Sequence, residues 1–421
     1  MTIDAAIVDY SAALLLRYFR RGDPLKGGSP QVEHRRDLHM LRGHWSISSP
    51  VRALVSYVLS HPHEAQSLLV MRTRHDDAMA RGRIDARQTW LHRLQTGLPS
   101  TIVAHEPIRS FLTGPNLLLA WVLREAATYT ARLSSWQGPA SPYLEAIERS
   151  QGEMRSLQRL TSLREPLRAV AVGRRPDGNA VRVAARSRRV VYRLAVEAYN
   201  LLQGVERGDS AAIEHVARSA LLGPLEEWRR FEIAVGLAVA EALAEATGEP
   251  MVLNLLSGDT TAPIATAGRF AIHWQQRTPF YSAPDLERSE VLSREILAAY
   301  NLSTGSDRPD LIVVDLSAQR VVSIIEVKYV AGDTAPARFR DAVYQVVRYA
   351  RGYAGGGEIS SILSHSLVAI SQDAPVLAVP WAEVPMSIDF EGIRLNGLAA
   401  WAARLVAHPS PLPSPATLLP V

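Results

Sequence analysis

The sequence contains no cysteine. Disulfide bonds, thiolate zinc sites and a cysteine nucleophile are therefore excluded for this chain. There is also no run of about eighteen apolar residues, so we expect no membrane-spanning helix. The N-terminal segment places acidic residues before its apolar stretch and arginines after it, which is the reverse of a secretory signal. These absences together favour a cytoplasmic protein that has no contact with membranes.

Lysine is almost absent as well. Of the 46 basic residues, only Lys26 and Lys328 are lysines, and all the others are arginines. A lysine inside a buried strand of such a chain indicates a position that the wide guanidinium fork of arginine cannot fill. Lysine offers a compact point charge with an adjustable pKa instead.

Charge of each sign is concentrated in a different part of the chain. Residues 1–222 contain 31 basic and 20 acidic side chains, whereas residues 223–377 contain 13 basic and 19 acidic ones. A basic region is suited to a polyanion, because neutralising phosphates supplies most non-specific affinity for nucleic acids. An arginine-rich, solvated helical surface explains the same composition, and the sequence leaves both interpretations open.

Apolar periodicity predicts a mainly helical first part and an α/β second part. Helices are predicted over residues 4–21, 116–135, 142–162 and 184–204, and over 51–80 with a break at 61–63. After residue 223 the pattern predicts helices over 225–247 and 338–353 and strands over 268–274, 311–316, 321–327 and 366–371. The second part has about 150 residues, a usual domain size.

Three regions follow from this pattern. Residues 1–205 form a mostly helical, basic region that could bind DNA or a partner, and residues 206–378 form the α/β domain. Residues 379–421 form a C-terminal extension with a proline-rich tail.

The two strands at 311–316 and 321–327 predict a site. If the hairpin is symmetric about Ala318, Val314 faces Val322 and Asp310 faces Glu326. Side chains directly opposite each other in a sheet have Cβ atoms about 4.5–5.5 Å apart. Lys328 lies two residues beyond Glu326 and so shares its face. The arrangement therefore brings two carboxylates and one ammonium together.

Two carboxylates on an apolar sheet are costly unless a cation neutralises them. Hard oxygen ligands suit Mg²⁺ or Mn²⁺, which would polarise a phosphate and acidify a bound water. Lys328 would then position or deprotonate that water, or stabilise the charge of the transition state. A structural ion pair at a sheet edge is the alternative. Asp315 has the opposite parity on its strand and is not expected to bind the metal.

The motif Pro309-Asp310 followed by Glu326-Val327-Lys328 resembles the signature of the PD-(D/E)xK nuclease superfamily. The resemblance implies a restriction-endonuclease-like core. It also implies a further acid from the helix that precedes the sheet, and Glu232 occupies the matching position, where it would bind the metal together with Asp310 and Glu326. Gln345 and Tyr349 match the QxxxY motif of several subfamilies, where these side chains orient the lysine or contact DNA.

Residues from about 225 to 372 are similar to the McrC-like nuclease subunits of modification-dependent restriction systems, and the N-terminal part resembles them more loosely. This resemblance implies a metal-dependent endonuclease that hydrolyses DNA in a restriction or anti-phage defence system. It also implies a separate NTP-driven motor as partner. The sequence has no GxxxxGK[ST] phosphate-binding loop of its own and no GxSxG motif of a serine hydrolase. No DNA-reading motif is recognisable, so the resemblance transfers no target sequence.

Two other functions remain open from the sequence. One is a DNA repair or recombination nuclease, which uses the same chemistry in another role. The other is a DNA-binding scaffold subunit that keeps the nuclease fold without cutting. The acids and the lysine of the motif favour an enzyme over the scaffold.

Overall fold

The structure is a computed structural model of the 421-residue chain. It describes residues 2–21, 32–76, 82–137, 141–254, 262–281, 308–330, 334–354, 359–378 and 384–407, and residues 292, 295, 296 and 299. The chain divides into two compact units. Residues 1–44, 133–145 and 205–421 form the first, here the sheet unit, and residues 45–132 and 146–204 form the second, here the helical unit. None of the described helices is long and apolar enough to cross a membrane.

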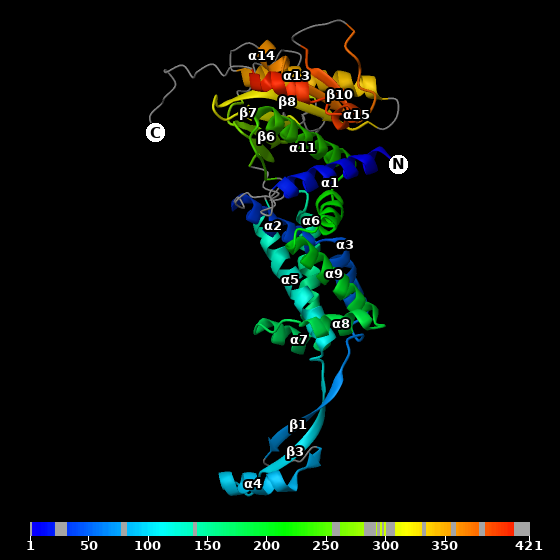
Figure 1. Cartoon of the computed structure of the whole chain (residues 1–421), viewed down its shortest axis with the longest axis vertical. Coiled ribbons are helices and arrows are strands. Elements are labelled where there is room, and N and C mark those ends of the chain that lie inside the picture. The colour runs from blue at the N-terminus through cyan, green and yellow to red at the C-terminus, as the bar shows by residue number, and fades with distance from the viewer. Residues whose placement is uncertain are drawn as a thin grey trace, which may run out of the picture. The chain divides into compact units, whose positions relative to one another are not determined.

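The helical unit consists mainly of helices, as expected for this part of the chain (Figure 1). It contains α3 (Ser49–Ser60), α5 (Gly114–Trp136), α6 (Leu144–Leu157), α7 (Thr161–Ala171), α8 (Gly178–Arg186) and α9 (Val190–Glu206), one end each of α5, α6 and α9 lying in the sheet unit. Asp177 caps α8, since its side chain accepts a hydrogen bond from the backbone N–H of Ala180. The predicted helix over 184–204 is thus two helices, separated at residues 187–189.

A three-stranded antiparallel sheet extends the helical unit. Its strands are β1 (Leu68–Asp76), β2 (Arg83–Ile84) and β3 (Ile102–Ser110), in the order β1-β3-β2, and α4 (Ala86–Thr96) packs beside β3. The prediction of a helix over 51–80 is therefore wrong beyond residue 60. Both faces of β1 are exposed, with Leu69 77% accessible, so the strand shows no apolar alternation. The partner strand fixes its conformation instead.

A buried hydrogen-bond network holds the chain just before β1 and just after β3, where this pair of strands joins the helices. The Tyr192 hydroxyl of α9 donates to Asn116 Oδ1 of α5 and accepts from the Gln66 backbone N–H, both at 2.6 Å. The Asn116 amide donates to the carbonyl oxygens of Gln66 and Phe111 at 2.7 Å. Gln66 precedes β1 and Phe111 follows β3, so one network connects the two ends of this pair of strands to the helices.

The sheet unit contains a seven-stranded mixed sheet, which makes the fold of this part α/β. Its strands are β4 (Met251–Leu253), β5 (Ala265–Ala267), β6 (Phe270–Trp274), β7 (Leu311–Asp315), β8 (Arg320–Lys328), β9 (Leu367–Ile370) and β10 (Met386–Asp389). The order is β10-β9-β8-β7-β6-β5-β4. Neighbours from β4 to β8 are antiparallel, whereas β8, β9 and β10 run parallel.

Helices cover both faces of this sheet. The helices of the unit are α1 (Ile3–Arg21), α2 (Val32–Trp45), α10 (Ser210–Val216), the π-helical turn η2 (Ala217–Leu222), α11 (Glu227–Thr247), α13 (Ala335–Ala354), α14 (Ile359–Leu363), α15 (Phe390–Arg394) and α16 (Ala399–Ala407). Figure 1 shows α11 and α13 on opposite sides of the sheet. The α11 helix packs on β4, β5, β6 and β8, and α13 packs on β8 and β9. Leu311 of β7 lies beside Gly236 of α11, and Ile312 and Val314 share a core with α13, so β7 and β8 are buried between the two helices as their apolar sequences predicted.

The hairpin of β7 and β8 has the predicted register at the end that is near Asp310 and Glu326. Leu311 pairs with Ile325, so the same register continued by one residue sets Asp310 opposite Glu326. Towards the turn a bulge shifts the pairing, and Val314 faces Val321 instead of the predicted Val322. The turn itself contains Gln319 at φ +49°. The bulge thus changes the turn end and leaves the site end in the predicted register.

The units differ from the three regions expected from the sequence. Residues 1–44 belong to the sheet unit, because α1 packs on α11. Residues 386–407 of the expected C-terminal extension also belong to it, since β10 joins the sheet and α16 packs on α11. The tail beyond residue 407 lies outside the described residues. The chain returns to the sheet unit at residue 205, close to the expected boundary between the first two regions.

Candidate active site

Asp310, Glu326 and Lys328 lie in contact at the ends of β7 and β8. The Lys328 ammonium donates to Glu326 Oε1 at 2.5 Å, and its Nζ lies 3.7 Å from Asp310 Oδ2. The same Asp310 oxygen accepts a hydrogen bond from the Val327 backbone N–H at 2.8 Å. This bond anchors the Asp310 carboxylate between the two residues of β8. The structure therefore brings the three predicted residues together.

Burial determines the electrostatics of this cluster. Glu326 is 1% exposed, and its pKa rises to about 8, first because of burial and then because of the negative charge of Asp310. Burial lowers the pKa of Lys328, but the charges of Glu326 and Asp310 outweigh this effect and leave it raised. The ammonium is thus held between two carboxylates, where a guanidinium fork would need a wider space.

One oxygen of this cluster lacks an N–H or hydroxyl donor. Glu326 Oε2 is buried and accepts no hydrogen bond from an N–H or hydroxyl group of the described residues, while the Asp310 carboxyl group lies close enough to hydrogen-bond with Glu326 when one of the two acids is protonated. A buried carboxylate oxygen without a donor is costly, and such an oxygen is a good ligand for a hard divalent cation. No group of three His, Asp or Glu side chains in the described parts of the chain is arranged to hold an ion. Asp310 and Glu326 bring two sets of carboxylate oxygens to one place, and these are the ligands that Mg²⁺ and Mn²⁺ prefer, so a metal ion held by these two residues stays a prediction.

Glu232 comes to this cluster from α11, as expected. It is 3% exposed, and its Oε2 accepts hydrogen bonds from Trp274 Nε1 at 2.6 Å and Gln275 Nε2 at 2.9 Å. Its pKa rises to about 8, first because of burial and then because of the charge of Asp310, while the two donors and Lys328 counteract this. The three acids and the lysine therefore form one electrostatic unit.

Gln275 is a site residue that the sequence did not reveal. It follows the last residue of β6 and has φ +49°, the left-handed conformation that non-glycine residues seldom adopt. Its backbone N–H donates to the Asp310 carbonyl oxygen at 2.8 Å. The predicted strand ended at Trp274, and nothing in the residues Trp-Gln-Gln signals a turn that directs an amide back to a helix.

The QxxxY pair has a different setting. Gln345 and Tyr349 lie on α13 as expected, but the bonds of Asp310, Glu326 and Lys328 within the described residues involve neither of them. Tyr349 is 4% exposed and belongs to the apolar core between α13 and the sheet. The buried Gln345 Oε1 lacks a hydrogen-bond partner in the described part of the chain. Their role in orienting the lysine or contacting DNA stays a prediction.

Asp315 is used structurally, which agrees with its expected exclusion from the metal site. Its Oδ1 accepts hydrogen bonds from the backbone N–H groups of Ser317 and Ala318, and its Oδ2 lies 3.2 Å from Arg269 Nε. These contacts stabilise the turn between β7 and β8.

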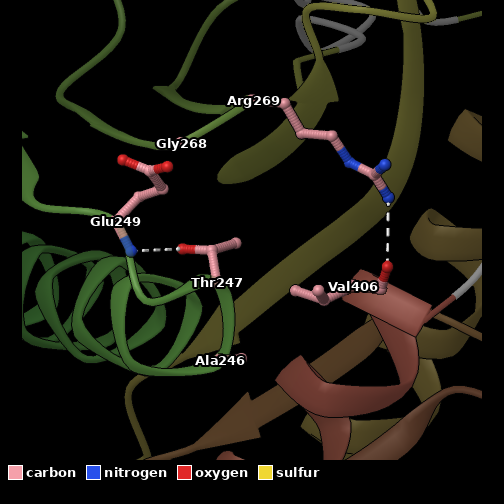
Figure 2. Close-up of a pocket in the computed structure, with 6 residues that line it drawn as sticks. All are labelled: Ala246, Thr247, Glu249, Gly268, Arg269 and Val406. Carbon is pink, nitrogen blue, oxygen red and sulfur yellow. Dashed lines mark hydrogen bonds between the residues drawn. The ribbon is translucent and has the colours of Figure 1, made fainter.

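A hollow of about 540 Å³ lies at the C-terminal end of α11. Figure 2 shows the residues that line it: Ala246, Thr247, Glu249, Gly268, Arg269 and Val406. Arg269 Nη2 donates to the Val406 carbonyl oxygen at 3.1 Å, and Glu249 N–H donates to Thr247 Oγ1 at 3.3 Å. The arginine thereby joins the β5–β6 turn to α16. None of the predicted site residues lines this hollow.

Comparison with known proteins yields little. No protein-family model matches the sequence, and neither does any curated protein. A solved structure that the chain resembles is a half-complex from the tetradecameric assembly of Thermococcus gammatolerans McrB AAA+ hexamers with bound McrC. The identity is 13% and the TM-score 0.25, and the match covers 83% of this chain and 65% of that one. A likeness this weak assigns no family, so the arrangement of Glu232, Asp310, Glu326 and Lys328 carries the functional argument.

Proposed function

We propose that this chain is a Mg²⁺- or Mn²⁺-dependent deoxyribonuclease with a restriction-endonuclease-like core of the PD-(D/E)xK type. The observation that carries the proposal is the contact of Asp310, Glu326 and Lys328 at adjacent strand ends, with one buried Glu326 oxygen left without an N–H or hydroxyl donor in the described part of the chain. A purely structural ion pair would need one acid for one lysine. Here two acids share the ammonium, and a third, Glu232, is close enough for its pKa to respond to Asp310.

Each side chain has a definable task in this proposal. Asp310 and Glu326 would hold the metal ion, which, when bound, polarises the scissile phosphate and makes a coordinated water more acidic. Val327 N–H fixes the Asp310 carboxylate through its hydrogen bond, so one ligand is preorganised by the backbone. Glu232 would assist from α11, either at the ion or through a water.

The geometry favours one of the roles considered for Lys328. Its ammonium donates to Glu326 Oε1, and an ammonium has no lone pair with which to accept a proton. Electrostatic stabilisation of the charge that develops on the phosphate is therefore better supported than general base catalysis.

The proposed setting is restriction or anti-phage defence, with a separate NTP-driven motor as partner. Support comes from the similarity of residues 225–372 to McrC-like subunits and from the lack of a phosphate-binding loop in this chain.

DNA cleavage with Mg²⁺ or Mn²⁺ tests the proposal. The wild type, alone or with the motor, is expected to cut, and Asp310→Ala and Lys328→Ala should each lose about 100-fold or more in rate. Asp341→Ala, which removes an exposed acid of α13, serves as the matched control and should cut normally. If the wild type cuts under no condition, or if both site variants cut like the control, the proposal fails. DNA binding without cutting would instead support the scaffold function.

A further inference from the structure

The hydrogen bonds of Glu232 are unevenly distributed. Trp274 Nε1 and Gln275 Nε2 both donate to Oε2, at 2.6 and 2.9 Å, whereas Oε1 accepts no hydrogen bond from the described residues. A buried carboxylate that only needs to be neutralised is best served by donors to both oxygens. Two donors on one oxygen instead hold the orientation of the group and leave the second oxygen available.

Gln275 also connects Glu232 to a second acid of the site. Its side chain donates to Glu232, and its backbone N–H donates to the Asp310 carbonyl oxygen at 2.8 Å. These two bonds come from one residue in the left-handed conformation, at φ +49°. Such a conformation is unfavourable for a non-glycine residue, so it persists where the surrounding bonds require it. Gln275 thus sets the position of the α11 acid relative to the chain that enters β7.

The geometry points to Trp274 and Gln275 as positioning residues. We propose that they fix the Glu232 carboxylate by its Oε2 so that its Oε1 stays available to a water bound to the metal ion. This inference rests on the proposed function, because it needs the metal site. It assigns the two residues an indirect role, since neither of them is expected to touch substrate.

Calorimetric titration of the full chain with Mn²⁺ alone, without DNA, tests the inference. Gln275→Gly removes the side-chain amide while keeping a residue that tolerates positive φ, and Trp274→Phe removes the indole N–H while keeping an aromatic ring at this position. Gln276→Ala is the matched control. The neighbouring Gln276 side chain bonds to His273 and to the Ala262 carbonyl oxygen, and not to Glu232.

Both test variants are expected to raise the Kd for Mn²⁺ by about tenfold or more, while Gln276→Ala leaves it unchanged. Combining Gln275→Gly with Glu232→Gln should raise the Kd no further than Glu232→Gln alone, because both changes remove the same interaction. Melting temperatures in EDTA separate this role from a purely structural one. Variants that melt earlier but bind Mn²⁺ like the wild type would overturn the inference and leave the proposed function intact. A wild type that binds no Mn²⁺ would overturn both.

Discussion

Glu326→Gln tests how much the buried, ionised Glu326 side chain destabilises the folded chain when no metal ion is bound. Glu326 is 1% exposed, and its pKa rises from 4.5 to about 8 in the folded chain. Because the folded-state pKa lies above the unfolded value, the folded form keeps the proton longer. Stability is therefore unaffected below pH 4.5, falls as the pH rises from 4.5 to about 8, and stays reduced above that.

The difference between the folded and unfolded pKa values of Glu326 sets the size of this loss of stability. At about 1.4 kcal/mol per pKa unit it corresponds to an upper limit of about 5 kcal/mol, and we expect about 2–5 kcal/mol since the neighbouring acids share protons. Glutamine does not ionise. The free energy of unfolding of Glu326→Gln, relative to the wild type, should therefore increase by this amount between pH 5 and pH 8.5.

Urea unfolding in EDTA at a series of pH values measures the difference. Glu391→Gln, at an acid whose side chain is 60% exposed, is the control and should follow the wild type at every pH. Parallel stability curves for Glu326→Gln and the wild type from pH 5 to 8.5 would refute the reasoning. Mg²⁺ should stabilise the wild type at pH 8.5 more than at pH 5, because protonation competes with the metal.

Two further predictions concern packing and hydrogen bonding. Gly236→Ala should be less favourable than Gly152→Ala by about 1 kcal/mol or more, because the new Cβ would lie 2.8 Å from Ile264 Cδ1 on the α11 face that packs against the sheet, and this close contact opposes the gain in helix propensity. Gly152→Ala, in a helix with open space at that position, should be neutral or stabilising in thermal unfolding, and equal effects of the two would contradict this packing. Tyr192→Phe removes the hydroxyl that bonds to Asn116 and to the Gln66 backbone N–H before β1, and it should lower the free energy of unfolding by about 1–3 kcal/mol. Tyr344→Phe, at a side chain that is 69% exposed, should change urea stability by less than about 0.5 kcal/mol, and a similar loss in both variants would show that the network contributes nothing.

The central hairpin and the first helix over the sheet were predictable because their signals are local. Two short runs rich in Val and Ile on either side of a four-residue turn define β7 and β8, and Gly248 in the left-handed conformation ends α11 where expected. Counting from the turn was enough to align Asp310 with Glu326. The bulge near Val322 was not predictable, because nothing in a β-branched run marks the residue that is left unpaired.

Other features depend on contacts between distant parts of the chain. The strand β1 pairs with β3 about 35 residues away and is exposed on both faces, so its apolar residues gave no strand signal. Residues 1–44 belong with the sheet because α1 packs on α11, about 220 residues later. The role of Gln275 was not predictable for the same reason, since it depends on Glu232 and Asp310, which are distant from Gln275 in the sequence.

The near-absence of lysine gives the site a chemical handle. Reductive methylation with isotope-labelled formaldehyde attaches methyl groups to primary amines only, which in this chain are Lys26, Lys328 and any free N-terminal amine. The resulting NMR spectrum would be simple enough to assign by substitution of a single lysine. Because the Lys328 side chain is only 18% exposed and bonds to Glu326, its methyl signals should appear slowly and at a distinct position. They would report changes in the acid cluster within the full chain, with no cysteine or fluorophore introduced.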